Sequence, residues 1–284
     1  ENGSYHIGSH EINDHDKKFS WLTVEKIIEH SSNIGCVKIG EKLGNRSLFT
    51  YARDFGFGNK TFIRLAGEAA GTLRPVYKWN ELSTASVSFG QEISCTALQL
   101  GCMVSAIANG GELVKPRILR GIRDNKSEHF TETEPQVIRR VISEKTARQV
   151  TDIMVDVVNA GTGELAGVEG ITVAGKTGTA QKSVDGYSGY LRGVYVSSFV
   201  GFWPAEAPVY AMVLVLDEPR EDYWSTTSAA PLFGRIVERI MGLPVQSRNK
   251  KTRVAGSEDR RELVFASYTR EENDHTAAEP SSSL

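Results

Sequence analysis

The sequence has few cysteines, and none of them occurs in a Cys-x-x-Cys pair. Its three cysteines therefore offer neither a metal-binding nor a redox motif of that kind. Cys95 and Cys102 lie two turns apart on a predicted helix, about 10.5 Å along its axis, which is too far for a disulfide. We expect all three cysteines, including Cys36, to be buried free thiols.

The sequence also lacks excess charge and any long apolar run. A net charge of −2 indicates neither a nucleic-acid partner nor a strongly electrostatic membrane surface. The longest apolar run, residues 209–216, has the length of a strand, well short of the roughly 18 residues that suggest a membrane span. The first residues have neither the basic nor the apolar region of a signal peptide, and they include no initiator Met. We expect a fragment of a longer polypeptide, whose own ends do not report its compartment.

What is present is an ordinary globular composition with clear periodicity. The apolar spacing predicts helices and strands, and a loop over residues 67–75. The predicted helices are residues 20–30, 34–43, 45–56, 94–109, 143–160 and 231–241. The predicted strands are residues 114–122, 137–142, 171–181, 193–203 and 209–216. The last two strands are joined by a hairpin-length segment, which indicates an antiparallel sheet. The fold class is therefore α+β, with helices covering both faces of the sheet.

The composition changes near the end of the chain. Residues 1–244 contain the periodic segments, whereas residues 245–284 are crowded with charged residues and contain Pro-Ser-Ser-Ser near their end. A segment with so few apolar residues cannot build a core. We therefore predict one domain over residues 1–244 and a flexible polar tail over residues 245–284.

Two short motifs point to acyl transfer on a serine. Lys176-Thr177-Gly178 lies in a predicted strand, and Ser31-Ser32-Asn33 interrupts the first helical stretch. A Ser-x-Asn and a Lys-Thr-Gly are two of three motifs of one class of serine acyl-transfer site; the third, a Ser-x-x-Lys, carries the nucleophile. Either triplet alone is more often a cap, turn or strand end, so only the combination is informative.

The residue types in the two triplets suit distinct roles. Lys176 can supply the positive charge that lowers the pKa of a second lysine acting as base. Ser31 can bridge that charge to the attacking group and relay a proton. Asn33 can hold a substrate amide because its side chain both donates and accepts hydrogen bonds.

The predicted strand adds a surface for an extended substrate. In an undistorted strand Lys176 and Gly178 point to one face, and Thr177 and Thr179 to the other. Gly178 leaves room for close approach of a substrate, which could pair with the strand if it lies at a sheet edge. The N–H of Thr179 is a candidate oxyanion donor, and the hydroxyl of Thr177 or Thr179 a candidate ligand for a terminal carboxylate.

Further short motifs accompany the two triplets in a fixed order. They are Ser31-Ser32-Asn33-Ile34-Gly35, Val37-Lys38-Ile39, Leu43-Gly44, Gly67-Glu68, Gly71, Trp79, Ser88-Phe89-Gly90-Gln91, Leu98-Gln99-Leu100, Ala106-Ile107-Ala108-Asn109-Gly110-Gly111, Pro116, Gly161-Thr162-Gly163, residues 174–181 and Phe199-Val200-Gly201-Phe202-Trp203-Pro204. Over about residues 2–244 the chain thereby resembles the transpeptidase domain of class B penicillin-binding proteins, the septal, cell-division type in particular.

The resemblance implies a D,D-transpeptidase that cross-links the peptide stems of peptidoglycan through an acyl-enzyme and is acylated by β-lactams. Residue by residue, it assigns the family's two motifs to Ser31, Asn33 and residues 176–178, and an oxyanion-hole role to the backbone of Thr179. It implies no metal or organic cofactor. It also implies a domain on the extracytoplasmic face of the bacterial cell membrane, anchored by an N-terminal helix absent from this chain, with divisome or elongation membrane proteins as partners.

One family motif is missing from its expected place. A Ser-x-x-Lys should precede Ser31, but residues 1–30 contain none, and Ser247-Arg248-Asn249-Lys250 follows both other motifs and is attributed to chance. We therefore expect the nucleophile and its base outside this chain. Two alternatives stay open: a non-catalytic peptidoglycan-binding or scaffold relative, and a serine β-lactamase or carboxypeptidase-like hydrolase. Residues 199–204 and the long spacing between motifs argue against the hydrolase.

Overall fold

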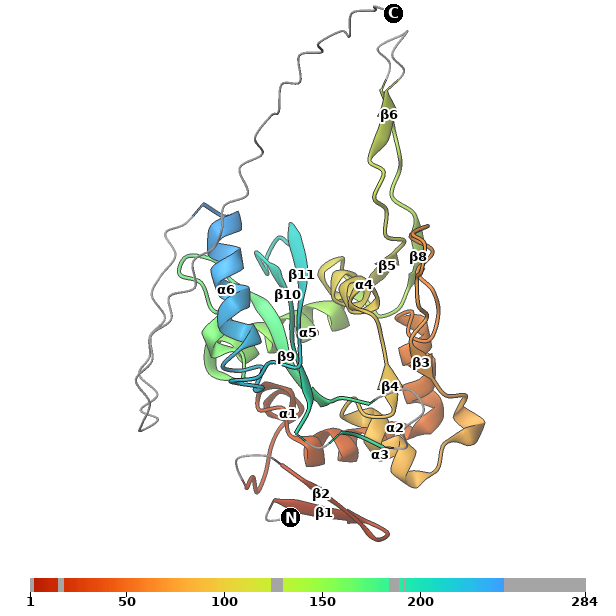
Figure 1. Cartoon of the computed structure of the whole chain (residues 1–284), viewed down its shortest axis with the longest axis vertical. Coiled ribbons are helices and arrows are strands. Elements are labelled where there is room, and N and C mark those ends of the chain that lie inside the picture. Colours follow the sequence, from red (N-terminus) through yellow and green to blue (C-terminus); the bar gives the residue numbers. More distant parts are fainter. Residues whose placement is uncertain (1–2, 15–17, 124–129, 184–188, 192, 243–284) are drawn as a thin grey trace, which may run out of the picture. The chain divides into compact units, whose positions relative to one another are not determined.

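The structure is a computed structural model that describes residues 3–14, 18–123, 130–183, 189–191 and 193–242 (Figure 1). The helices are α1 (Val24–Glu29), α2 (Asn33–Asp54), η1 (Val76–Lys78), α3 (Glu81–Ser88), α4 (Ala97–Ala108), α5 (Glu144–Ala160), η2 (Glu164–Ala166) and α6 (Ala229–Ile240). The strands are β1 (Ser4–Ile7), β2 (His10–Asn13), β3 (Thr72–Leu73), β4 (Ile93–Ser94), β5 (Glu112–Val114), β6 (Gly121–Arg123), β7 (Phe130–Glu132), β8 (Val137–Arg140), β9 (Ala174–Gln181), β10 (Tyr195–Trp203) and β11 (Tyr210–Asp217). The predicted tail and the boundary before it lie outside the described residues.

The central sheet has the strand order β11-β10-β9, and both pairings are antiparallel. Side chains of β10 alternate between its two faces. Phe199 and Trp203 pack with Phe233 of α6 on one face, whereas Phe202 packs with residues of α4 and α5 on the other. Figure 1 shows α6 and α4 on opposite sides of the sheet, and the predicted α+β class is confirmed.

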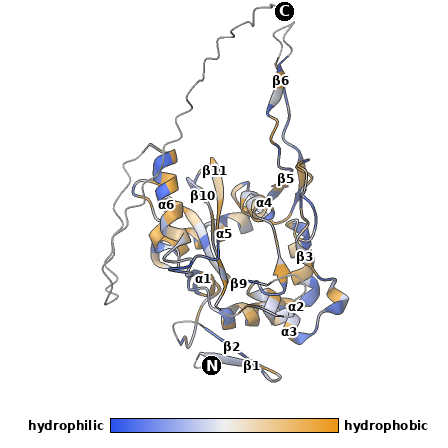
Figure 2. Ribbon diagram, viewed as in Figure 1, coloured by the Kyte–Doolittle hydropathy of each residue, from blue (hydrophilic) through white to orange (hydrophobic). Residues whose placement is uncertain are grey.

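The face covered by α6 holds the largest aromatic cluster among the described residues. Phe199 and Phe233 are fully buried with ring centroids 4.5 Å apart, and the Trp203 ring lies 5.7 Å from that of Phe233. Figure 2 shows both apolar and hydrophilic residues on α6, as expected for a helix that packs one side on a sheet. This cluster gives β9 a rigid base, because β9 is hydrogen-bonded to β10 along its length.

Helix boundaries follow the capping residues. The predicted break at Gly44 is confirmed, because Gly44 has φ 78° and ψ 158° inside α2. The predicted starts at residues 20 and 94 were wrong. Thr23 caps α1 by accepting the N–H of Lys26, and Thr96 caps α4 in a capping box with Gln99. Each hydroxyl satisfies a first-turn N–H that has no partner within the helix.

Two further predictions differ from the structure. The strand expected over residues 114–122 is two separate strands: β5 pairs with β8, and β6 pairs with β7 in a projecting hairpin (Figure 1). The cysteines are free thiols, but Cys95 precedes α4 and is exposed, while Cys36 and Cys102 are partly buried. The expectation of burial was therefore wrong for Cys95, because that residue lies in the connection before the helix.

Candidate functional site

Ser31 lies in the tight junction between α1 and α2. The N–H of Ser31 donates to the carbonyl of Ile28, and the N–H of Ser32 donates to that of Ile27. This pair of bonds ends a helix on a residue of left-handed conformation, and Ser31 has φ 56°. Ser32 then caps α2 by accepting the N–H of Gly35 at 3.0 Å. The hydroxyl of Ser31 is thus left out of both helix caps.

The same hydroxyl meets the side chain of Lys176 on β9. The Nζ of Lys176 donates to the Oγ of Ser31 at 3.0 Å, to the Oγ1 of Thr177 at 3.2 Å and to the carbonyl of Thr177 at 3.1 Å. An ammonium group has three protons to donate, so these contacts account for all of them. Burial lowers the pKa of Lys176 to about 8. The two predicted motifs therefore meet at one charged centre.

Thr162 connects the two walls of this site. Its hydroxyl lies 2.7 Å from the hydroxyl of Thr177, and its N–H donates to the carbonyl of Glu29 at the end of α1. A Cβ on the preceding Gly161 would lie 2.6 Å from that carbonyl oxygen, so only glycine fits there. In the sequence, Thr162 belongs to a short Gly-Thr-Gly motif, from which its position between the two walls was not predicted.

The hydroxyl of Thr179, further along β9, contacts Ser225 and not Lys176 or Ser31. The Oγ1 of Thr179 accepts the N–H of Ser225 at 3.0 Å and lies 2.8 Å from the Ser225 hydroxyl. Gly178 has its nearest neighbour in β10, where a Cβ would lie 2.7 Å from the Ser198 hydroxyl. Among the described residues β9 is an edge strand, so an extended ligand can pair with its free side.

The side-chain amide of Asn33 contacts the segment before α1. Its Nδ2 donates to the carbonyl of Asn13, at the end of β2, at 3.0 Å. The structure thus brings Ser31, Lys176 and Thr177 together, while the hydrogen bonds of the Asn33 and Thr179 side chains go to Asn13 and Ser225. The roles predicted for these residues stay predictions.

Cys36 is a neighbour of the site that the motifs did not indicate. Burial raises the pKa of its thiol, the charge of Lys176 opposes that shift, and Asp14 adds to it. The thiol is therefore protonated at neutral pH and is a poor nucleophile in that state. No set of three His, Cys, Asp or Glu residues in the described part of the chain is placed to hold a metal ion, and none of its helices is long and apolar enough to span a membrane.

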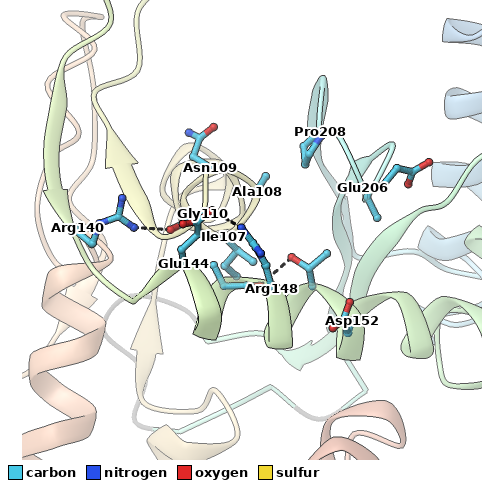
Figure 3. Close-up of a pocket in the computed structure, with 13 residues that line it drawn as sticks. Ile107, Ala108, Asn109, Gly110, Arg140, Glu144, Arg148, Asp152, Glu206 and Pro208 are labelled. Carbon is cyan, nitrogen blue, oxygen red and sulfur yellow. Dashed lines mark hydrogen bonds and ion pairs between the residues drawn. The ribbon is translucent and has the colours of Figure 1, made fainter.

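A cavity of about 750 Å³ lies apart from these residues, between α4, α5 and the turn after β10 (Figure 3). Both of its arginines are already paired, Arg140 with Glu112 at 2.7 Å and Arg148 with Glu144 at 2.5 Å. None of the predicted site residues lines it. We assign it no part in the chemistry.

Comparison of the sequence with known proteins identifies relatives of this chain. A family model described as "Penicillin binding protein transpeptidase domain" matches residues 1–238. Stage V sporulation protein D of Bacillus subtilis is 40% identical over 76% of this chain and 33% of its own length. Penicillin-binding protein PbpB of Mycobacterium tuberculosis is 36% identical over 77% of this chain and 33% of its own length. The chain thus spans 33% of the length of these two curated relatives.

Solved structures share the fold. Penicillin binding protein 3 of Mycobacterium tuberculosis, in complex with ampicillin, superposes with a TM-score of 0.77 at 33% identity, covering 88% of this chain and 58% of that one. The transpeptidase domain of penicillin-binding protein 3 from Burkholderia pseudomallei gives a TM-score of 0.72 at 33% identity, covering 87% and 72%.

Proposed function

The chain belongs to the penicillin-binding protein transpeptidase family, and on that premise we propose that it is part of a peptidoglycan D,D-transpeptidase. The enzyme would cross-link peptide stems by serine acyl transfer and would be acylated by β-lactams. The single observation that carries this proposal is the 3.0 Å contact between Lys176 Nζ and Ser31 Oγ. It joins the two family motifs at one point beside an edge strand.

The reaction follows from the chemistry of the motifs. A serine Oγ attacks the carbonyl carbon of a D-alanyl peptide bond, its proton passes to a base, and the departing amine takes up a proton. The amine of a second stem then attacks the acyl-enzyme and releases the serine. The nucleophile and base belong to a Ser-x-x-Lys motif, which we place outside these 284 residues.

The residues described above take supporting roles. The positive charge of Lys176 lowers the pKa of the base lysine, and Ser31 passes a proton between that group and the leaving amine. The N–H of Thr179 helps to hold the oxyanion, Asn33 binds a substrate amide, and Gly178 allows the stem peptide to lie close to β9. The lowered pKa of Lys176, about 8, suits it to release and regain a proton near neutral pH.

Ligands, partners and location extend the same proposal. The relative solved with ampicillin supports β-lactams as ligands. The names of two other relatives, Stage V sporulation protein D of Bacillus subtilis and "Probable peptidoglycan D,D-transpeptidase FtsI" of Caulobacter vibrioides, support a role in cell-wall synthesis. We place the domain on the extracytoplasmic face of the cell membrane, anchored by an N-terminal helix and working with divisome or elongation membrane proteins.

Mass spectrometry after incubation with benzylpenicillin tests the proposal. The full polypeptide should gain one penicilloyl group on the serine of its Ser-x-x-Lys, and the 284-residue chain should gain none that is stable. A stable adduct on a serine of this chain would refute the placement of the nucleophile. An unmodified full polypeptide would refute transpeptidase activity and favour the non-catalytic scaffold. Rapid turnover of the adduct would favour the β-lactamase-like hydrolase.

A further inference from the structure

We propose that Asp14 is a positioning residue of this site, which holds the junction between α1 and α2 so that Ser31 stays within reach of Lys176. The inference rests on the proposed function. Both carboxylate oxygens of Asp14 accept the Ser32 hydroxyl, at 3.1 and 2.9 Å, and one also accepts the N–H of Ile34 at 3.1 Å. Asp14 therefore binds Ser32, the residue directly after Ser31, and Ile34 in the first turn of α2.

Asp14 completes the N-terminal cap of α2 from a distant segment. The first N–H groups of a helix have no partner within the helix. The N–H of Gly35 donates to the Ser32 hydroxyl, and the N–H of Ile34 donates to Asp14. A carboxylate at a helix N-terminus is favoured by the helix dipole, and its hydrogen bonds are charge-assisted. Ser32 is 3% exposed, and its hydroxyl meets Asp14 in a partly buried position.

The segment that carries Asp14 is itself anchored on α2. Ile12 of β2 is buried and packs with Ile34 and Val37. The carbonyl of Asn13, the next residue, accepts the side-chain amide of Asn33. Apolar packing and two sets of hydrogen bonds thus fix Asp14 relative to α2. Because Asp14 is fixed in this way, its carboxylate can restrain the junction between α1 and α2.

The conformation of Ser31 makes such a hold necessary. With φ 56°, Ser31 occupies a region that costs a side-chain-bearing residue on the order of 1 kcal/mol, and such strain persists only where neighbours enforce it. Without Asp14, the Ser32 hydroxyl and the Ile34 N–H lose an acceptor. The junction can then relax, and the Ser31 hydroxyl can move away from Lys176.

The test measures acylation of the full polypeptide by benzylpenicillin over a range of concentrations, which separates the dissociation constant of the non-covalent complex from the acylation rate constant. Asp14→Ala should lower the rate constant roughly 10- to 100-fold and leave the dissociation constant unchanged, because small displacements of a reacting group have effects of that size. Asp14→Asn keeps one oxygen for the Ile34 N–H and should recover most of the loss. Glu11→Gln, at an exposed position of β2, is the matched control and should change neither constant.

A second measurement does not depend on activity. Hydrogen exchange of the Ile34 and Gly35 amides should be faster in Asp14→Ala than in the wild type and unchanged in Glu11→Gln. An unchanged acylation rate constant in Asp14→Ala, or unchanged exchange at both amides, would overturn the inference. Absence of acylation in the wild type would instead refute the proposed function, and the exchange measurement would still decide whether Asp14 holds the junction.

Discussion

The Nζ of Lys176 lies 3.0 Å from the Oγ of Ser31, although 145 positions separate the two residues in the sequence. The contact joins a helix junction to an edge strand, and Thr162 bridges the same two elements through Glu29 and Thr177. Both α1 and β9 contact α5, so the geometry of the site depends on the packing of these two elements on that helix. Changes at Ser31 and Lys176 should therefore affect stability and chemistry in separable ways.

Ser31 should separate the two effects most clearly. Ser31→Gly and Ser31→Ala both remove the hydroxyl, but only glycine adopts the observed φ of 56° without a steric cost. We expect Ser31→Gly to be more stable than Ser31→Ala by about 1 kcal/mol. Urea unfolding of the two variants checks this difference. Equal stabilities would show that the left-handed conformation at Ser31 is not strained.

Lys176 should make stability depend on pH. Its pKa is about 8 in the folded chain, against 10.5 for an ordinary lysine. Between these two pKa values the unfolded chain binds more protons than the folded chain, so the free energy of unfolding rises with pH. Below pH 8 the folded chain bears the full cost of burying a charged lysine, and this cost disappears as the pH rises through the window. Relative to Lys176→Met, the free energy of unfolding of the wild type should rise by at most about 3 kcal/mol across this window. Urea unfolding at pH 7, 8, 9 and 10 tests it; parallel profiles would contradict it.

Gln99 should be important for stability although it lies in no catalytic motif. Its side chain is 1% exposed; its Nε2 donates to the carbonyls of Asn59 and Ala70, both at 2.8 Å, and its Oε1 accepts the N–H of Thr96. Gln99→Ala leaves these groups buried without partners, so we expect a loss of about 3 kcal/mol in the free energy of unfolding. Chemical denaturation measures the loss. Gln136→Ala, at an exposed position, is the control and should have little effect; a comparable loss there would contradict this explanation.

Local sequence signals predicted most of the fold. The hairpin after β10, the break at Gly44 and the α5 cap at Ser143 follow from turn and capping chemistry that acts within a few residues. The errors lie where two signals compete. Both Ser20 and Thr23 lie near the start of α1 and could cap it, and in the structure Thr23 does so. The division of the strand at residues 114–122 depends on which distant strand each half meets.

The site was predictable as far as its motifs extend. Lys176 and Ser31 could be paired in advance because two family motifs carry them. Asp14, Thr162 and Cys36 could not, because their contacts depend on the three-dimensional arrangement of segments that share no spacing rule. For Thr179, strand alternation predicts the face of the sheet on which its side chain lies. It does not predict that the partner on that face is Ser225.

The most direct test of the central claim is a double-mutant cycle at Lys176 and Ser31, measured as the rate constant for acylation of the full polypeptide by benzylpenicillin. Lys176→Ala and Ser31→Ala should each slow acylation by about 100-fold or more, and the double variant should be hardly slower than either, because groups that act as a unit are strongly non-additive. Independent, multiplicative effects, or an unchanged rate in Lys176→Ala, would contradict it.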